Sequence, residues 1–259
     1  MLNEWKSKDS FLPFADEVVR ALRAIGKQEE LSALVDGIAG CMGFRHYALI
    51  HHDDLRVEKP GLVDFRKYPP LVTERLVGQC RYRRDPIIRG CIFADSAFLW
   101  SELSKIIVLD RCDHDCFELG AREGLNEGIT VPYVHLGDCM GSCTFAGTIA
   151  PESAPRYLGI VQMVGIFAFQ AARRLMGHPS PVPIAPRLHP RPRDCVMLAG
   201  RGLSNKQIAR QLALTPRTVD GYLTEARRLF NAHDRTELVV SAVLAGEVGL
   251  DELKRRQPE

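Results

Sequence analysis

The stretch that decides the fold of one half of the chain is SNKQIARQLALTPRTVDGYLTEARRLF, residues 204–230. Ser204 and Gln207 have the spacing of a capping box, so a helix begins at this point. A short connection follows, and Thr215 can then cap a second helix that has Pro216 at its first position, where the missing N–H costs nothing. Two helices joined in this way predict a helix-turn-helix.

The second of these helices separates an apolar face from a polar face. Val219, Leu223 and Ala226 recur at helical spacing and are predicted to face inward. An exposed helix of this kind enters the major groove of DNA, and the positive N-terminal ends of both helices favour contacts with phosphate. The residues predicted to contact DNA are Ser204, Asn205, Lys206, Thr215, Arg217, Thr218, Asp220, Gly221, Thr224, Arg227 and Arg228.

These residues differ in the contact that each can make. The three arginines can neutralise phosphates, whereas Asp220 and Thr224 are placed to meet bases, since a carboxylate repels phosphate but accepts from cytosine N4. Gly221 in the middle of a helix costs about 1 kcal/mol relative to alanine, which a close approach of the backbone to DNA would explain. The alternative interpretation is a plain helical hairpin with solvated arginines.

Charge and proline placement predict two domains. Of the 259 residues, those from Pro183 onward include thirteen Lys and Arg against nine Asp and Glu, whereas the preceding part has twenty-one against twenty-three. An excess of positive charge in one module favours nucleic-acid binding. Six prolines between residues 179 and 192 indicate a linker. We therefore predict an N-terminal domain over 1–176, a linker over 177–189 and a DNA-binding domain over 190–259.

The N-terminal part mixes helix and strand patterns. Helices are expected at 11–25, 31–42, 69–82, 113–124 and 151–176, and strands at 47–50, 128–135 and 139–148, the last two joined by a turn at 136–138. This order predicts an α+β fold, an α-β-α sandwich with helices on both faces of an antiparallel sheet, which can enclose a small-molecule cavity. The C-terminal domain is predicted to be all-α, with four helices at 192–201, 204–212, 215–230 and 236–246.

The C-terminal domain resembles the LuxR-type helix-turn-helix domain. The runs Gly202–Ala209, Leu214–Val219 and Arg235–Val239 match its signature positions. The resemblance implies a four-helix domain whose last helix contributes to dimerisation. The opening departs from the family: it reads LHPRP, where the family has L-T-P-R and then a glutamate in the first helix. The start of that helix and its salt bridges are therefore not implied.

The N-terminal domain resembles the acyl-homoserine-lactone-binding domain of the same family, which makes it a signal-binding domain. The matching positions are Tyr68-Pro69, Asp85-Pro86, Trp100, Gly128 and Thr144. The resemblance implies that Tyr68 and Asp85 hydrogen-bond the amide group of the signal, a charge-assisted contact in the case of the carboxylate. It further implies that Trp100 is a wall of the pocket and that Thr144 lies near the acyl carbonyl.

Each of these residues also has an ordinary structural interpretation. Asp85 can cap a helix or turn beside Pro86, Trp100 can belong to the core, and Gly128 can serve a turn into a strand. Thr144 alternates along a strand and can face either side. Asp85, if it is buried, is the residue that most requires a partner, because an ionised carboxylate is costly away from water.

Two positions depart from the family pattern in the pocket itself. Val72 replaces a tryptophan that donates its indole N–H to the lactone carbonyl, and Leu76 replaces a tyrosine one turn later. A buried acceptor left without a partner costs about 1–3 kcal/mol. The ligand is therefore an acyl-homoserine lactone or a different small amide or apolar signal, and a domain without a ligand also remains open. We include Val72 and Leu76 among the predicted ligand-contacting residues.

The cysteines leave a metal-binding or redox function open. They are Cys41, Cys80, Cys91, Cys112, Cys116, Cys139, Cys143 and Cys195. Without a secretory pattern, reduced thiols are expected. Two Cys-x3-Cys spacings, at 112–116 and 139–143, could together supply the four ligands of a structural zinc site. Buried free thiols are the simpler interpretation, and we predict no metal.

The sequence thus predicts a transcription regulator rather than an enzyme. It contains no Gly-rich phosphate loop, HExxH or GxSxG motif, and we expect no cofactor. The absence of a signal peptide and of a long apolar segment predicts a cytoplasmic protein that contacts no membrane. The expected partners are a small signal, double-stranded DNA read as an inverted repeat, and a second copy of the chain, paired through helix 151–176 and the last helix. The alternatives are a regulator that senses a non-lactone signal, a metal or thiol redox sensor, and a module that sequesters another regulator by protein contact.

Overall fold

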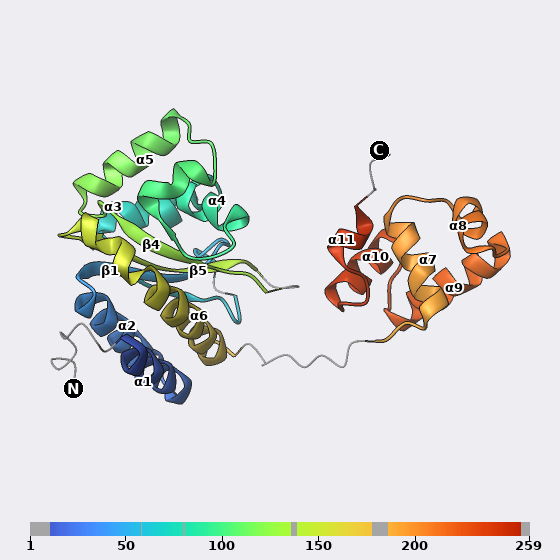
Figure 1. Cartoon of the computed structure of the whole chain (residues 1–259), viewed down its shortest axis with the longest axis horizontal. Coiled ribbons are helices and arrows are strands. Elements are labelled where there is room, and N and C mark those ends of the chain that lie inside the picture. Colours follow the sequence, from blue (N-terminus) through green and yellow to red (C-terminus); the bar gives the residue numbers. More distant parts are fainter. Residues whose placement is uncertain (1–10, 58, 80, 136–138, 178–185, 255–259) are drawn as a thin grey trace. The chain divides into compact units, whose positions relative to one another are not determined.

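The computed structural model describes residues 11–57, 59–79, 81–135, 139–177 and 186–254. Contacts between Cα atoms divide the chain into two compact units, Met1–Ser180 and Pro181–Glu259, which we describe separately. Figure 1 shows both units with their helices and strands labelled. The division falls within the segment 177–189 that the prolines mark.

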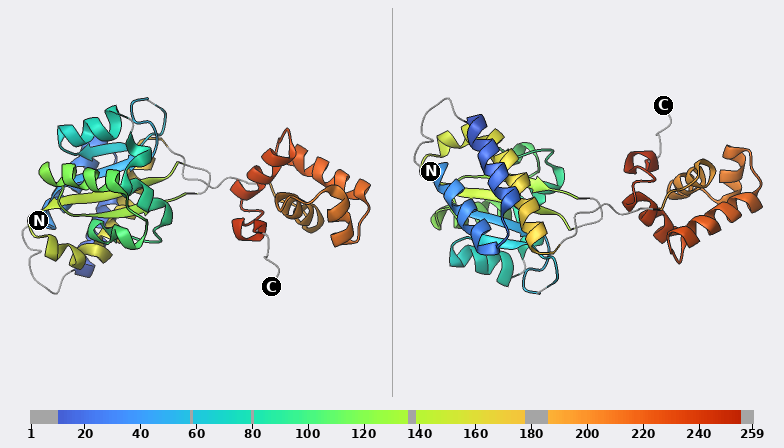
Figure 2. Two further views of the ribbon diagram at one scale, coloured as in Figure 1. Left: turned by 90° about the horizontal axis from the view of Figure 1, so that it is seen from above. Right: turned by 90° about the horizontal axis from the view of Figure 1, so that it is seen from below.

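The N-terminal unit is built on a five-stranded antiparallel sheet. The strands are β1 (Phe44–His51), β2 (Asp64–Lys67), β3 (Phe98–Leu99), β4 (Gly128–Tyr133) and β5 (Gly141–Thr148), in the order β2-β1-β5-β4-β3. The helices are α1 (Phe11–Ala24), α2 (Gln28–Cys41), α3 (Pro70–Thr73), α4 (Pro86–Phe93), α5 (Arg111–Arg122) and α6 (Leu158–Leu175). Helices α1, α2 and α6 cover one face of the sheet, and α4 and α5 lie on the other (Figure 2). The α+β prediction is confirmed.

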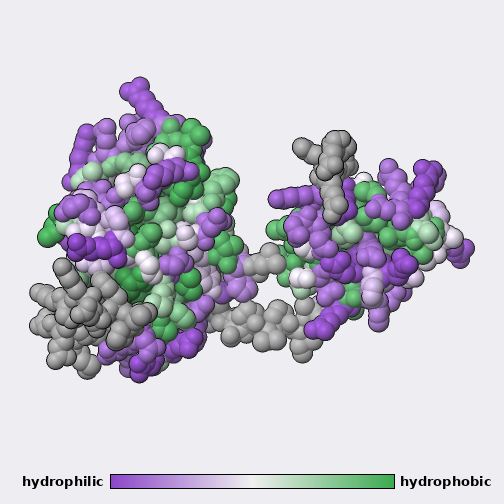
Figure 3. Space-filling model, viewed as in Figure 1, coloured by the Kyte–Doolittle hydropathy of each residue, from purple (hydrophilic) through white to green (hydrophobic). Residues whose placement is uncertain are grey.

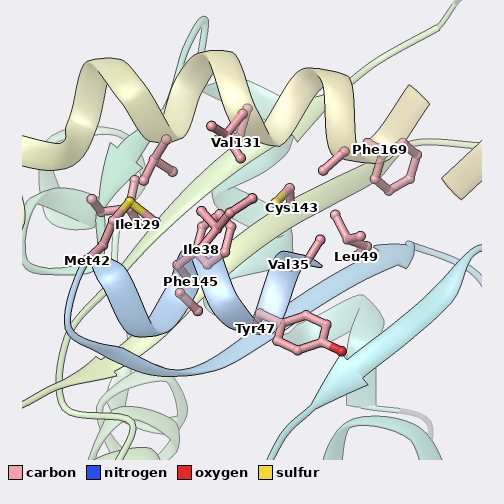
Figure 4. Packing of buried hydrophobic residues seen from close by; sticks show 14 of the residues in the cluster. Val35, Ile38, Met42, Tyr47, Leu49, Ile129, Val131, Cys143, Phe145 and Phe169 are labelled. Atoms are coloured by element: carbon pink, nitrogen blue, oxygen red, sulfur yellow. The ribbon is translucent and has the colours of Figure 1, made fainter. Parts of the chain in front are cut away.

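Side-chain alternation along the strands gives the sheet two different faces. Leu49 lies opposite Cys143, which in turn lies opposite Val131. All three are fully buried in the main core under α6 (Figure 4). Successive residues of a strand point to opposite faces, so Thr144 and Thr130, which are paired in the same register, face away from this core. One side of the sheet is therefore apolar, and the other carries hydroxyl groups.

Helix α6 lies unusually close to the sheet at one glycine. A Cβ atom at Gly165 would lie 2.7 Å from Val131 Cγ2 and 3.3 Å from Cys143 Cβ. Only a residue without a side chain allows the helix backbone to pack at this separation. The contact fixes the depth at which α6 sits on strands β4 and β5.

The predicted single helix over 69–82 is wrong. Helix α3 covers only Pro70–Thr73, and it continues as a π-helical turn, Glu74–Gly78, and a 3-10 turn, Arg81–Arg84. Gly78 weakens a regular helix, and the residue before Pro86 is biased away from helical geometry. The chain between α3 and α4 is therefore irregular, and this part of the chain includes Leu76 and leads to Asp85, two of the predicted ligand-contacting residues.

Other differences concern element lengths and short elements. The predicted helix over 151–176 begins as a 3-10 turn, Pro151–Tyr157, because Pro155 has no N–H to donate, and becomes α-helical only in α6. Strands β2 and β3 and helix α4 were not predicted, since runs of two to eight residues carry little periodicity. The predicted turn at 136–138 lies outside the described residues.

The C-terminal unit is all-α, with its own core. Its helices are α7 (Pro190–Gly200), α8 (Asn205–Leu212), α9 (Pro216–Leu229), α10 (Arg235–Leu244) and α11 (Leu250–Leu253), the last of which was not predicted. Val196, Leu198, Ile208, Val219 and Leu238 are fully buried between them. Hydrophilic side chains cover most of the face of this unit that is seen in Figure 3.

The first helix of this unit, α7, is tied to the last helix, α11, by contacts with Glu252. Helix α7 begins at Pro190, with Pro192 buried in its first turn. Arg193 Nη2 pairs with Glu252 Oε2 at 2.6 Å, and Arg201 Nε donates to the Glu252 carbonyl oxygen at 2.6 Å. These two contacts attach α7 and its C-cap residue Arg201 to α11.

Candidate ligand cavity and nucleic-acid interface

A partly enclosed cavity of about 70 Å³ lies on the hydroxyl-bearing face of the sheet. Its walls come from β1, β5, α4, α5 and α3 with the irregular segment that follows it, together with Tyr68, Trp100 and Leu125. The structure places all six sequence-predicted ligand residues in its lining: Tyr68, Val72, Leu76, Asp85, Trp100 and Thr144. The remaining lining residues are Ile50, Pro86, Ile87, Ile88, Cys116, Phe117, Gly120, Leu125 and Ser142. Most of this lining is apolar, with a few converging polar groups, as in many small-molecule sites.

The sheet side of the cavity carries a chain of hydrogen bonds. Trp100 Nε1 donates to Thr130 Oγ1 at 3.0 Å, and Thr130 Oγ1 shares a hydrogen bond with Thr144 Oγ1 at 2.9 Å. Thr130 was not predicted as a site residue, although the strand alternation that places Thr144 on this face also places Thr130 there. A Cβ at Gly128 would lie 2.7 Å from Trp100 Cε2, so this glycine leaves room for the indole ring. The position of Trp100 is thus fixed from two sides.

Asp85 caps α4, as the sequence allows, and it also lines the cavity. Its Oδ1 accepts from the backbone N–H groups of Ile87 at 2.9 Å and Ile88 at 3.1 Å, so it caps α4. Its Oδ2 lies 3.8 Å from Cys116 Sγ, on the cavity wall. Burial raises the pKa of this carboxyl, and the two backbone N–H groups and Arg75 oppose the shift. The second oxygen of Asp85 therefore accepts from the Cys116 thiol, a weak donor, beside the cavity that both residues line.

Tyr68 supplies a second polar group to the same cavity. Burial raises the pKa of its hydroxyl, which also interacts with Thr144. The group is therefore a neutral phenol at physiological pH and can donate or accept one hydrogen bond. By contrast, Val72 and Leu76 offer no hydrogen-bonding group on their side of the cavity.

The two cysteine pairs lie in different surroundings. Cys116 lines the cavity and Cys112 is exposed on α5, whereas Cys143 is buried in the core under α6. Cys139 precedes β5 rather than lying within it. Burial raises the pKa of Cys116 to about 12 and raises that of Cys143 as well. Within the described ranges, no three His, Cys, Asp or Glu residues are close enough to hold a metal ion.

The helix-turn-helix is formed by α8 and α9, and its caps are those that the sequence indicates. Ser204 Oγ accepts from the Gln207 N–H at 3.4 Å, and Gln207 Oε1 accepts from the Ser204 N–H at 2.8 Å, which completes the capping box. Thr215 Oγ1 accepts from the Thr218 N–H at 3.1 Å. Ala213 adopts a left-handed conformation, with a φ of 54°, at the turn between the helices. The predicted residues that are exposed are Ser204, Lys206, Thr215, Arg217, Asp220, Gly221 and Arg228.

Several of the predicted DNA-contacting residues also form side-chain hydrogen bonds within the unit. Asn205 Nδ2 donates to Asp220 Oδ1 at 3.2 Å, and Asn205 Oδ1 accepts from Arg235 Nη1 at 2.9 Å. Asn205 thereby connects α8 to both α9 and α10. Arg227 Nη2 donates to Thr224 Oγ1 at 3.1 Å, beside a surface hollow at the end of α9. For Asn205 the sequence offered no sign of this connecting role, because its partners lie fifteen and thirty residues away.

A largely apolar cavity with a few polar groups in one unit, and an exposed helix-turn-helix in the other, define a DNA-binding protein that responds to a small molecule. Residues 27–172 match the autoinducer binding domain family, and residues 187–242 match the luxR family of bacterial regulatory proteins. The chain therefore belongs to the LuxR-type transcriptional regulators with an autoinducer-binding domain. Within the described residues, no helix is long and apolar enough to cross a membrane.

Individual relatives cover almost the whole chain. The HTH-type quorum sensing-dependent transcriptional regulator RpaR of Rhodopseudomonas palustris is 30% identical over 241 residues, which span 92% of this chain and 95% of that protein. The transcriptional activator protein AhyR of Aeromonas hydrophila is 23% identical, over 89% and 90% of the two chains. Among solved structures, SdiA in complex with octanoyl-rac-glycerol has a TM-score of 0.56 at 15% identity, over 92% of this chain and 97% of that one. Escherichia coli SdiA in another crystal form has a TM-score of 0.54 at 15% identity, over 92% and 98%. These similarities support the fold.

Proposed function

We propose that the cavity binds an acyl-homoserine lactone or a related small amide, and that Tyr68, Val72, Leu76, Asp85, Trp100 and Thr144 contact it. The observation that carries this proposal is the second oxygen of Asp85. It lies at the wall of a largely apolar cavity and accepts a long contact from Cys116 Sγ at 3.8 Å, while the first oxygen caps α4. An amide N–H of a ligand would satisfy this acceptor, and its acyl chain would fill the apolar space beside Trp100.

The same proposal assigns DNA contacts to both helices of the helix-turn-helix. Helix α9 lies in the major groove, where Arg217 and Arg228 meet phosphates and Thr224 meets bases. Ser204, Lys206, Thr215, Thr218 and Arg227 contact the DNA backbone, and Gly221 allows its close approach. Asn205 and Asp220 contact DNA as a hydrogen-bonded pair, which holds the carboxylate toward a cytosine N4 rather than a phosphate.

The working form is a cytoplasmic homodimer without catalytic activity. Pairing through α6 and the last helices presents two copies of α9 to an inverted repeat whose half-sites lie about one helical turn, ~34 Å, apart. A ligand that binds only the folded protein stabilises it by about 2.7 kcal/mol at a hundred times its dissociation constant. Signal binding would in this way raise the amount of folded, DNA-competent dimer.

The ligand half of the proposal is tested with the Asp85→Asn variant. Asparagine caps a helix as well as aspartate, so α4 should keep its stability, while the acceptor for the ligand amide is lost. Thermal unfolding of the full chain is measured with acyl-homoserine lactones of increasing acyl length. We expect the wild type and an exposed control on α5, Asp115→Asn, to be stabilised, and Asp85→Asn to lose at least tenfold in affinity. Equal stabilisation of all three proteins would contradict the assignment.

The DNA half is tested by the salt dependence of binding. Each lost phosphate contact lowers the slope of log K against log salt by about 0.9. We expect Arg217→Ala and Arg228→Ala to lower this slope for an inverted-repeat duplex, whereas Arg122→Ala, an exposed arginine of α5, should leave it unchanged. Unchanged slopes for all three variants would show that α9 does not meet the duplex.

A further inference from the structure

A second cavity, of about 80 Å³, adjoins the first and has a different electrostatic character. It shares Val72, Leu76, Asp85, Cys116 and Gly120 with the apolar cavity, so the same side chains form the boundary of both. Its remaining lining residues are Arg75, Arg81, Arg84, Cys112 and Leu119. Three arginines therefore line the space next to the proposed ligand site.

The positive charge of these arginines is offset only in part, by the interaction of Arg75 with Asp85. In the part of the chain that the structure describes, Arg75, Arg81 and Arg84 form no hydrogen bond or ion pair, whereas Arg89 and Arg193 each pair with a carboxylate. Asp85 is the one carboxylate in the described lining of this cavity, and its Oδ1 already accepts two backbone N–H groups. The second cavity thus has an excess of positive charge.

Arg75 is the most sheltered of the three. It is partly buried, whereas Arg81 and Arg84 are exposed. It lies one helical turn after Val72, and both residues line the second cavity. A guanidinium group presents a planar fork of N–H donors that matches the two oxygens of a carboxylate. The attraction is stronger in a partly enclosed site than in open water.

The wall between the cavities disfavours an uncharged polar head group. Val72 and Leu76 cannot donate a hydrogen bond, so the ring carbonyl of a lactone placed against them has no partner there. A carboxylate that extends past this wall would instead reach the arginines. The apolar cavity, Asp85 and the basic cavity thus lie in this order. A ligand with an acyl chain, an amide and a carboxylate has matching groups in the same order.

We infer that the signal is an N-acyl amino acid with a free carboxylate. Its acyl chain lies in the apolar cavity, its amide N–H donates to Asp85 Oδ2, and its carboxylate is held by Arg75, with Arg81 and Arg84 at the entrance. The inference rests on the proposed function of the cavity and replaces the lactone by its open, charged counterpart.

The test compares two compounds that differ only in the ring. N-hexanoyl-homoserine lactone and its hydrolysis product, N-hexanoyl-homoserine, are titrated into the full chain by calorimetry at neutral pH. We expect the open acid to bind at least tenfold more tightly than the lactone, and its affinity to fall with increasing salt, since the contact is partly exposed.

Variants identify the group that recognises the acid. Arg75→Gln should remove at least tenfold of the affinity for the open acid and leave that for the lactone unchanged, and Arg75→Lys should restore only part of the loss. Arg83→Gln is the matched control, because Arg83 lies between Arg81 and Arg84 but packs on Tyr82 and does not line the cavity. Unfolding midpoints of all variants show that a loss of binding is not a loss of fold.

Each outcome separates this inference from the proposed function. If the lactone binds more tightly and its binding needs Asp85, the proposed function stands and the carboxylate inference is wrong. If Arg75→Gln weakens both compounds equally, Arg75 does not read the charge and the inference is also wrong. If neither compound binds, both statements about the ligand fail, while the DNA-binding tests of α9 remain unaffected.

Discussion

Arg89 Nη1 lies 2.9 Å from Asp113 Oδ1 and 3.0 Å from Asp113 Oδ2, so a single guanidinium nitrogen bridges both oxygens of a carboxylate that is only 3% exposed. Asp113 also accepts from the Asp110 N–H at 2.9 Å in the capping box of α5. The pair therefore joins α4 to α5, the two helices that flank the ligand cavity opposite the sheet. Breaking this pair should therefore loosen the contact between these two helices.

Replacement of Asp113 by Asn should destabilise the N-terminal unit. The substitution removes the charge that Arg89 faces and weakens the cap of α5. A partly buried partner left unsatisfied costs about 1–3 kcal/mol, measured by urea unfolding of the full chain. The control is Asp16→Asn, which breaks an ion pair with Arg20 on the surface of α1; such exposed pairs contribute about 0–1 kcal/mol. Equal effects of the two substitutions would show that the Arg89 pair does not hold the helices together.

Replacement of Gly128 by Ala should disturb ligand binding more than the addition of a single methyl group would suggest. The added methyl would lie 2.7 Å from the indole of Trp100, which must then leave its hydrogen bond to Thr130. We expect a loss of the stabilisation by ligand in thermal unfolding and a change in Trp100 fluorescence. Gly26→Ala serves as the control, because no heavy atom lies within 4 Å of a Cβ at that position. An unchanged response of Gly128→Ala to the ligand would exclude Trp100 as a wall of the site.

Replacement of Gly221 by Ala should separate stability from DNA binding. No heavy atom lies within 4 Å of a Cβ at Gly221, so alanine should raise stability by the helix-propensity difference of about 1 kcal/mol. The same methyl would obstruct close approach to DNA, and the affinity for the operator should fall. Gly40→Ala in α2 has the same open surroundings and should stabilise without any change in DNA affinity. An unaffected affinity in Gly221→Ala would leave this glycine without a role at the interface.

His52 should make the fold sensitive to acid. Burial lowers its pKa to about 4, and its Nε2 lies 3.0 Å from Ser142 Oγ at the edge of the cavity face. The unfolded chain, with a histidine pKa of about 6.5, takes up a proton before the folded chain does. The contribution of neutral His52 to the free energy of unfolding is therefore fully present above pH 6.5. It decreases as the pH drops toward 4, by at most about 3 kcal/mol.

The measurement for His52 is the free energy of unfolding between pH 7 and pH 4. His52→Gln should flatten the slope in this window, whereas the exposed control His114→Gln should not. His46, whose pKa is also lowered by burial, contributes in the same direction and should leave some residual slope in the variant. A slope unchanged by His52→Gln would show that its proton is not linked to folding.

The sequence was most informative where local chemistry decides the structure. Ser204, Gln207 and Thr215 cap their helices through contacts within three residues, so a capping pattern is sufficient to predict α8 and α9. Helices in long segments with apolar periodicity, such as α1, α2 and α6, could be predicted equally well. The fold class followed from these elements together with the two long strands β4 and β5.

The features that could not be predicted depend on residues far apart in the chain. Strand β3 consists of two residues that are defined only by pairing with β4. The contacts of Asn205 with Asp220 and Arg235, and the proximity of Arg75 to Asp85, arise only after folding. The orientation of Thr130 could have been predicted, because a strand that places Ile129 and Val131 in the core must direct Thr130 to the opposite face of the sheet.

That alternation has a consequence for how such a receptor can change its specificity over evolutionary time. On β5, the cavity-lining residues Ser142 and Thr144 alternate with Cys143 and Phe145, which are buried in the core on the other face of the sheet. A substitution at Ser142 or Thr144 would therefore change the cavity lining directly, and one at Thr130 would change it through Trp100 and Thr144, while Ile129, Val131, Cys143 and Phe145 stay in the core. Alternate residues of the same two strands thus face the cavity side and the core, so the cavity side can vary during evolution while the core packing is kept.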